Sequence, residues 1–210
     1  MKNLLITLFI SGLLLACTTP SVEMEATGEF ASEGLYTVKN SGFAEAYVRR
    51  GSGLSSYQKI DAQPLNVSDV DIPSTAVAGT LRRDWAMTPE REAALQRAWS
   101  NAVGKAFSGY QQASAGKGVL EIDAKITKIA PGVATANTIG APTQVRMTMN
   151  DAIEIFAEFR LFNSADDQLL AVIRDNRTIG AAAMSRTAPI NMTLLLDSWA
   201  ALLHTRVSGK

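Results

Sequence analysis

Apolar and polar residues alternate along residues 120–127, and this pattern predicts a half-buried β-strand. Residues 152–162 predict a second strand, and residues 168–178 predict a third that returns beside it. Between the last two, the turn-forming sequence Asn-Ser-Ala-Asp-Asp at 163–167 predicts a β-hairpin. In residues 152–162 the side expected to face the core carries Ile153, Ile155, Ala157, Phe159 and Leu161, and the other side carries Glu154, Phe156, Glu158 and Arg160.

Less regular segments flank these strands. Residues 57–67 predict one strand with a break at Pro64, because proline is tolerated only at a sheet edge or a bulge. We expect Pro131 to end the strand that precedes it. The Gly-, Ala- and Thr-rich residues 132–143 predict a flexible loop, and residues 145–149 predict the beginning of the next strand.

Two further stretches carry apolar residues at helical spacing. The first begins at Thr88-Pro89, where threonine can cap the helix and proline suits the first turn, and Gly109 ends it. The second covers residues 191–207. The apolar stripes consist of Leu95, Trp99, Ala102, Val103, Ala106 and Phe107 in the first helix, and of Leu195, Trp199, Leu202 and Val207 in the second.

The predicted element order is therefore β-α-β-β-β-α. Two apolar helical stripes and one apolar sheet face bury one another when both helices pack on the same side of the sheet. We therefore expect an α+β fold of two layers, with a mainly antiparallel sheet and the helices packed on one face. It should form a single domain at residues 41–210, a usual size for one domain.

The amino terminus has the pattern of a secretory signal. A positive charge at Lys2 precedes an apolar run at residues 4–15. As a helix this run would reach only about 20 Å, short of the ~30 Å hydrocarbon core, so we expect no spanning anchor. The run ends in Leu14-Leu15-Ala16-Cys17, which resembles the bacterial lipobox, whose cysteine is alkylated with diacylglycerol before cleavage in front of it.

The lipobox resemblance implies a signal peptide at residues 1–16 and a lipid on Cys17. Because two or more acyl chains hold a protein stably at a membrane, the expected first partner is the membrane itself. Lipoproteins kept at the inner membrane often carry Asp after the cysteine. Thr18 stands there instead, which favours the periplasmic face of the outer membrane. The Ser-, Thr-, Glu- and Gly-rich residues 17–40 predict a flexible tether.

The composition argues against a disulfide within the chain and against a nucleic-acid partner. Cys17 is the only cysteine among the 210 residues, so we expect no disulfide within the chain. Twenty Lys and Arg residues balance 20 Asp and Glu residues, which gives a formal net charge of +0. Because nucleic-acid binding calls for a basic excess, we expect no nucleic-acid partner.

The only histidine, His204, follows Asp197 by seven residues on the second predicted helix. That spacing puts about 10 Å between them along the helix axis, too far for the carboxylate to orient the imidazole. A Ser-His-Asp site would need serines brought close by the tertiary structure, and a surface or helix-end histidine is the simpler interpretation. A zinc site needs three or four ligands. We expect no catalytic residue, metal site or cofactor.

Other candidate sites have structural interpretations. Glu154 and Glu158 share a strand face with α-carbons about 13 Å apart, whereas glycosidase carboxylates lie ~5–9.5 Å apart. We therefore expect these two to pair with cations across strands. Asp166-Asp167 lacks calcium-loop spacing and should form a turn. Gly51-Ser52-Gly53 next to Arg49-Arg50 has no third glycine or Lys-Ser/Thr pair for a phosphate loop, and predicts a bend.

The three tryptophans, Trp85, Trp99 and Trp199, are expected to anchor the core or an interface rather than to form ligand platforms.

A family resemblance rests on two short motifs. Ser41-Gly42-Phe43 opens the ordered region, and Tyr47-Val48-Arg49-Arg50-Gly51-Ser52-Gly53-Leu54-Ser55-Ser56-Tyr57-Gln58-Lys59-Ile60 follows. Together with the lipobox and the order of elements, they resemble the bacterial lipoproteins called domain of unknown function 3313. The resemblance covers about residues 41–207 and implies no activity, substrate or catalytic residue.

Three functions are compatible with these features. The first is a non-enzymatic, lipid-anchored accessory or interaction subunit of the cell envelope, with an envelope protein as partner. The second is a binding module for a small molecule or lipid, with residues 132–143 as a lid. The third and least favoured is a periplasmic hydrolase, which would need a cleft that contains His204 or clustered acids.

Overall fold

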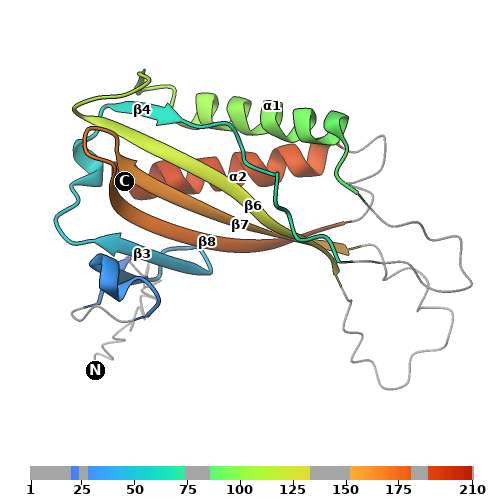
Figure 1. Cartoon of the computed structure of the whole chain (residues 1–210), viewed down its shortest axis with the longest axis horizontal. Helices are drawn as coiled ribbons and strands as arrows, with labels where there is room; N and C mark the ends of the chain where they lie inside the picture. Colours follow the sequence, from blue (N-terminus) through green and yellow to red (C-terminus); the bar gives the residue numbers. More distant parts are fainter. Residues whose placement is uncertain (1–19, 24–27, 74–85, 133–151, 181–188, 210) are drawn as a thin grey trace, which may run out of the picture.

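The computed structural model describes residues 20–23, 28–73, 86–132, 152–180 and 189–209. Within these ranges the protein has an α+β fold, an open, mixed sheet of eight strands with two helices on one face (Figure 1). The predicted fold class is therefore confirmed. Cys17, Trp85, the predicted strand start at 145–149 and nearly all of the predicted loop at 132–143 lie outside the described residues.

The strand order across the sheet is β1-β2-β3-β8-β7-β6-β4-β5. Neighbouring strands are antiparallel except for β4, which runs parallel to both β6 and β5. The strands are β1 (Ser21–Val22), β2 (Leu35–Lys39), β3 (Glu45–Arg49), β4 (Lys59–Ala62), β5 (Gln111–Gln112), β6 (Val119–Gly132), β7 (Ala152–Asn163) and β8 (Gln168–Gly180).

The three long strands are the ones that the sequence predicts, and β7 and β8 form the predicted hairpin. Asp166 stabilises its turn, because its Oδ1 accepts hydrogen bonds from the Asn163 side chain at 2.7 Å and the Gln168 N–H at 3.2 Å. The prediction that Pro131 ends its strand is wrong, since β6 continues to Gly132. Pro131 lies beyond the last contact of β6 with residues 63–73, where only β7 flanks it among the described strands and proline is tolerated.

The predicted strand at 57–67 is shorter than expected. Regular pairing covers only β4, and the chain then follows β6 irregularly past Pro64, as the predicted break implies. The Asn66 N–H donates to the Ala124 carbonyl at 2.8 Å, and the Asp71 N–H donates to the Thr127 carbonyl at 3.0 Å.

The predicted tether at 17–40 is wrong for its second half. The short helix η1 (Ala31–Glu33) and strand β2 belong to the folded domain, and β1 pairs with β2. Phe30 and Leu35 pack on Val172 of β8, on the sheet face opposite the helices, where each of the three is 0–4% exposed. Two large apolar residues with a partner strand are enough to order this segment despite its polar composition.

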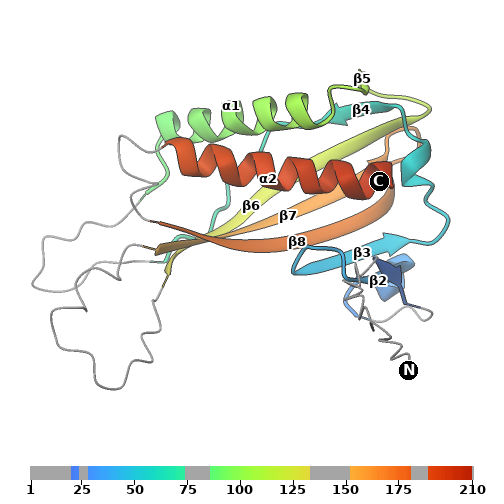
Figure 2. The same ribbon diagram turned by 180° about the vertical axis from the view of Figure 1, so that it is seen from behind.

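Both helices lie on one side of the sheet, α1 (Pro89–Ala106) beside α2 (Pro189–Ser208) (Figure 2). The Thr88 hydroxyl accepts a hydrogen bond from the Arg91 N–H at 3.4 Å, which confirms the predicted cap. Among the described residues, neither helix is long and apolar enough to cross a membrane.

The predicted stripes meet over Phe159 in the centre of the core. The rings of Trp99 and Trp199 each lie 5.7 Å from the Phe159 ring, the first stacked and the second edge-on, and both indoles are 0–1% exposed. These two tryptophans are therefore core anchors, as predicted. Their packing fills the space between the helices and the sheet, so the hollows described below lie at the surface.

Candidate functional site

Two of the surface hollows lined by described residues bear on function, and the larger of these is a groove between α1 and the edge of the sheet, which we call the α1 groove. Its volume is about 790 Å³, within the range of small-molecule sites. One wall is α1, and the other is formed by the chain after β4 and by β5. The groove is lined by Ala62, Gln63, Pro64, Gln96, Arg97, Trp99, Ser100, Val103, Gly104, Phe107, Ser108, Tyr110 and Gln112.

The α1 groove has an apolar floor and a polar, nearly uncharged rim. Trp99 belongs to the floor, and its indole N–H donates to the Gln63 carbonyl at 3.2 Å, which joins the two walls. The rim carries amides and hydroxyls, of which Ser100, Ser108 and Gln112 are exposed, and Arg97 is the one charged lining residue. Amides and hydroxyls both donate and accept, so the groove offers a ligand an apolar surface together with neutral hydrogen-bonding groups.

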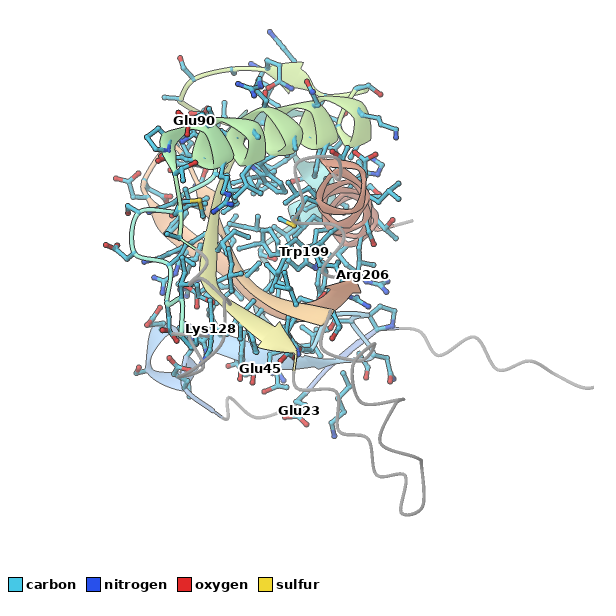
Figure 3. The ribbon with its side chains drawn as sticks, turned by 90° about the vertical axis from the view of Figure 1, so that its right-hand side faces the viewer. Glu23, Glu45, Glu90, Lys128, Trp199 and Arg206 are labelled. Atoms are coloured by element: carbon cyan, nitrogen blue, oxygen red, sulfur yellow. The ribbon has the colours of Figure 1, made fainter. Side chains whose placement is uncertain are left out.

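The smaller hollow, of about 210 Å³, lies on the sheet face opposite the helices, which we call the outer face. It borders a network centred on Arg174. This guanidinium contacts both carboxylate oxygens of Glu29, at 2.6 and 3.1 Å, and one oxygen of Glu158, at 2.7 Å. Arg160 binds the other Glu158 oxygen at 2.8 Å. The Glu45 carboxylate lies 3.6 Å from Arg174. Figure 3 shows Glu45 on the side of the long strands away from the helices.

The protonation of this network follows from its contacts. Burial by itself would raise the pKa of Glu158, but hydrogen bonds from Arg174 and Arg160 outweigh burial and hold that pKa below its usual range. Hydrogen bonds from Arg174 likewise lower the pKa of Glu29. Glu154, on the same face, accepts a hydrogen bond from Asn176. Glu158 is thus paired with a cation across strands, as expected, whereas the cross-strand partner of Glu154 is the neutral amide of Asn176.

Asp175 is a buried carboxylate that sequence reasoning missed. Its side chain is 4% exposed and accepts three hydrogen bonds: from the Ala44 N–H at 3.0 Å, the Trp199 indole at 2.7 Å and Arg177 at 2.7 Å. Figure 3 shows Trp199 between α2 and the sheet. Asp175 pairs with the buried Ala157 of β7 and so occupies a core position. Residues 169–173 are all apolar and residues 174–177 all polar, so the sequence does not mark Asp175 as a core position, and only its pairing with Ala157 does.

The Ser41-Gly42-Phe43 motif forms a turn against the end of α2. Arg206 of α2 donates to the Ser41 carbonyl at 2.6 Å, and the buried Ser41 hydroxyl accepts from the Phe43 N–H at 3.2 Å. Gly42 has φ +83°, and a Cβ there would lie 3.3 Å from Arg206. The motif therefore fixes the entry into β3, and its residues have structural roles.

The other residues considered in the sequence analysis lie apart from one another. The His204 ring packs edge-on against Phe107, with ring centres 5.2 Å apart, and Asp197 pairs with Lys105 at 3.1 Å. Arg49 donates to the main-chain carbonyls of Leu169 and Glu33, and Gly51-Ser52-Gly53 forms the predicted bend.

Across the described residues, no three His, Cys, Asp or Glu side chains are grouped so as to hold a metal ion.

No protein-family model matches the sequence, and no curated protein is significantly similar to it. Among solved structures, the chain is similar to the PelC dodecamer protein from Paraburkholderia phytofirmans, with TM-score 0.39 and 10% identity over 76% of this chain and 96% of that one. It is also similar to XCC0632 from Xanthomonas campestris, of the DUF330 family, with TM-score 0.42 and 15% identity over 77% of this chain and 91% of that one. The resemblance to domain of unknown function 3313 stays a prediction.

Proposed function

We propose that the protein is a lipid-anchored, non-enzymatic accessory or interaction subunit of the bacterial cell envelope. Acyl chains on Cys17 hold it at the periplasmic face of the outer membrane, and it acts by binding an envelope protein. The observation that carries this proposal is the sequence Leu14-Leu15-Ala16-Cys17 directly after an apolar run. The folded domain begins soon afterwards, with β1 at Ser21.

The buried and half-buried charges have structural contacts within the domain, which is compatible with a non-enzymatic role. Glu158, Arg174 and Asp175 each make two or more charged contacts or hydrogen bonds that tie strands, turns and α2 together. Charged side chains with this many partners stabilise the fold. A reaction that displaced one of them would break several hydrogen bonds or ion pairs.

Metabolic labelling with a palmitate analogue tests the anchor. The wild-type chain and the control variant Thr19→Ser should take up label and sediment with membranes, because both keep the lipobox pattern. Cys17→Ser should take up none, since it lacks the thiol that is alkylated. An intact mass that shows a free Cys17 thiol in the wild-type protein would overturn the proposed anchor.

Crosslinking in living cells, followed by mass spectrometry, tests the interaction role. We expect the same envelope protein to be captured repeatedly by the wild-type chain and lost on Cys17→Ser, which leaves the membrane. Repeated capture of no protein at all by the anchored chain would contradict an accessory role.

A second candidate function is a binding module for a small polar ligand, and the α1 groove is the observation that favours it. Its amide and hydroxyl rim fits neutral saccharides. Gly104 lines the groove with nothing within 4 Å of a Cβ, so Gly104→Trp should fill the groove without disturbing the core. Neutral oligosaccharides that raise the Tm of the wild-type protein should fail to raise that of the variant. Equal shifts in Tm for the wild-type protein and the variant would mean that the oligosaccharides bind outside the α1 groove.

A further inference from the structure

The short distance along the chain between Cys17 and the sheet limits how the domain can sit at a membrane. Strand β1 begins at Ser21, four residues after Cys17. Four residues span at most about 14 Å when fully extended. Because β1 pairs with β2 in register, from Ser21 opposite Lys39, this edge of the sheet must stay within that distance of the acylated residue.

We call the surface formed by Val22, Tyr36, Lys39 and Arg50 the β1 edge. Its side chains suit a lipid headgroup region. Val22 is one of the exposed large apolar residues, at 43% exposure. The Arg50 guanidinium lies 4.1 Å from the centre of the Tyr36 ring, and the Lys39 side chain, which pairs with Glu23, is 66% exposed. Tyrosine, arginine and lysine, with apolar stems and polar tips, are the residue types that favour a membrane interface.

The α1 groove lies at the opposite edge of the sheet. Strand order puts β1 at one edge and β5 at the other, with β4 next to it. Seven spacings of about 4.8 Å separate the two edges by roughly 34 Å. Figures 1 and 2 agree on this arrangement, since β3 lies on the side away from β4 and α1 in both views.

We propose that the domain stands on the membrane on its β1 edge, so that Val22, Tyr36 and Arg50 contact lipid headgroups and the α1 groove faces away from the bilayer. This orientation rests on the proposed acylation of Cys17. In the inverted orientation the width of the sheet, roughly 34 Å when followed from strand to strand, would lie between the lipid and β1, whereas four residues span at most about 14 Å.

Two orientations remain in which the domain would lie flat, on its outer face or on its helices. A domain lying on its outer face would bring Glu29 and Glu45 toward lipid phosphates together with Arg174, which pairs with both. Charge therefore does not decide against this orientation, and the label on β8 in the experiment below tests it. A domain lying on its helices would bring α1 and the groove itself onto the lipid, and the experiment below distinguishes that case.

Fluorescence quenching in vesicles tests the orientation. The acylated full chain has no free thiol, so an added cysteine takes a fluorophore alone. Val22→Cys reports the β1 edge, Thr178→Cys the outer face of β8, and Gly104→Cys the exposed side of α1. The vesicles contain phosphatidylethanolamine and phosphatidylglycerol, with a nitroxide quencher on a fraction of the headgroups. We expect most emission to be lost at position 22 and little to change at 104 and 178.

The outcomes separate the two proposals. Equal quenching at positions 22 and 178, or at 22 and 104, would overturn the standing orientation while the anchor stands. An intact mass that shows unmodified Cys17 would overturn the proposed function, and the orientation with it. A matched Cys17→Ser chain that carries the Val22→Cys label should lose the quenching, because the local surface alone does not hold it on the vesicle.

Discussion

At the scale of single residues, Asp175 shows how one buried charge can join three elements. Its carboxylate accepts from the chain just before β3, from α2 and from Arg177 of its own strand. A buried carboxylate is tolerated only when its lone pairs are satisfied, and this one has three donors. The donors in turn depend on it, since Trp199 has a fully buried indole.

Asp175→Asn should lower the free energy of unfolding by about 2–4 kcal/mol, because the amide is neutral and one of its two polar ends cannot accept hydrogen bonds. Urea denaturation measures this loss. The matched control is Asp197→Asn, which breaks the exposed pair with Lys105 and should cost at most about 1 kcal/mol. Equal losses for the two variants would contradict the role given to Asp175.

Glu158 gives the fold a dependence on pH. Its pKa is lowered in the folded protein, where burial is outweighed by Arg174 and Arg160, so the unfolded chain takes up a proton at higher pH than the folded chain. The stabilisation is complete above the unfolded pKa, which is about 4.3, and is lost as pH falls through the lower folded value.

Glu158→Gln should therefore reduce stability at neutral pH and flatten its decline below about pH 4.5. Chemical denaturation at a series of pH values measures both effects. Glu154→Gln removes a carboxylate of the same face that is bonded to Asn176, and is the control. The control should keep the pH dependence of the wild-type protein. If the stability of Glu158→Gln also fell with pH as steeply as that of the wild-type protein, the arginine network would not be the cause of the pH dependence.

At the scale of elements, the turn at Ser41-Gly42-Phe43 connects β2 and β3 to the end of α2. Its conformation requires glycine, because φ is +83° and a Cβ would press on Arg206 and Leu202. Arg206 and Arg177 donate to successive carbonyls of this turn. The helix end and the strand entry therefore hold one another in place.

Gly42→Ala should destabilise the protein by about 1–2 kcal/mol, the cost of left-handed backbone for an L-residue. Gly104→Ala is the matched control, since it lies within α1 with open space around its Cβ and should stabilise by about 0.5–1 kcal/mol. Differential scanning calorimetry would show opposite shifts in Tm. An unchanged or raised Tm for Gly42→Ala would mean that the turn tolerates other residues.

The sequence predicts the long elements well and the short ones poorly, for physical reasons. Strands β6 to β8 and both helices repeat their pattern over several turns or pleats, so periodicity alone identifies them. Strands β2 and β3 have five residues each, and β2 lies in polar sequence. It is ordered by Phe30 and Leu35 packing on β8, a contact distant in sequence that no local pattern contains.

The candidate sites were predictable in part. The outer-face pairing of Glu158 follows from alternation, whereas Arg174 as its centre requires the hairpin register, which puts the two residues opposite one another. The α1 groove was not predictable, because its walls come from α1 and from the segments around Gln63 and Gln112, which tertiary packing brings together.

At the scale of the whole molecule, the short link between Cys17 and β1 would let the lipid anchor also fix the orientation of the domain at the membrane. A flexible insert after Thr18 of about ten Gly and Ser residues adds roughly 18 Å of root-mean-square reach. We expect this insert to reduce the quenching at Val22→Cys while palmitate labelling stays unchanged. An insert of rigid proline-rich sequence should reduce it further, and unchanged quenching with either insert would mean that side-chain contacts alone hold the edge.

The two outermost strands of the sheet, Ser21–Val22 and Gln111–Gln112, are only two residues long. The edge strands of an open sheet can pair with a strand of another molecule. The number of unpaired main-chain N–H and C=O groups on the edge strand limits this pairing. Ends this short leave too few donors and acceptors to recruit another strand. Molecules concentrated on a crowded bilayer surface would therefore resist growth into fibres.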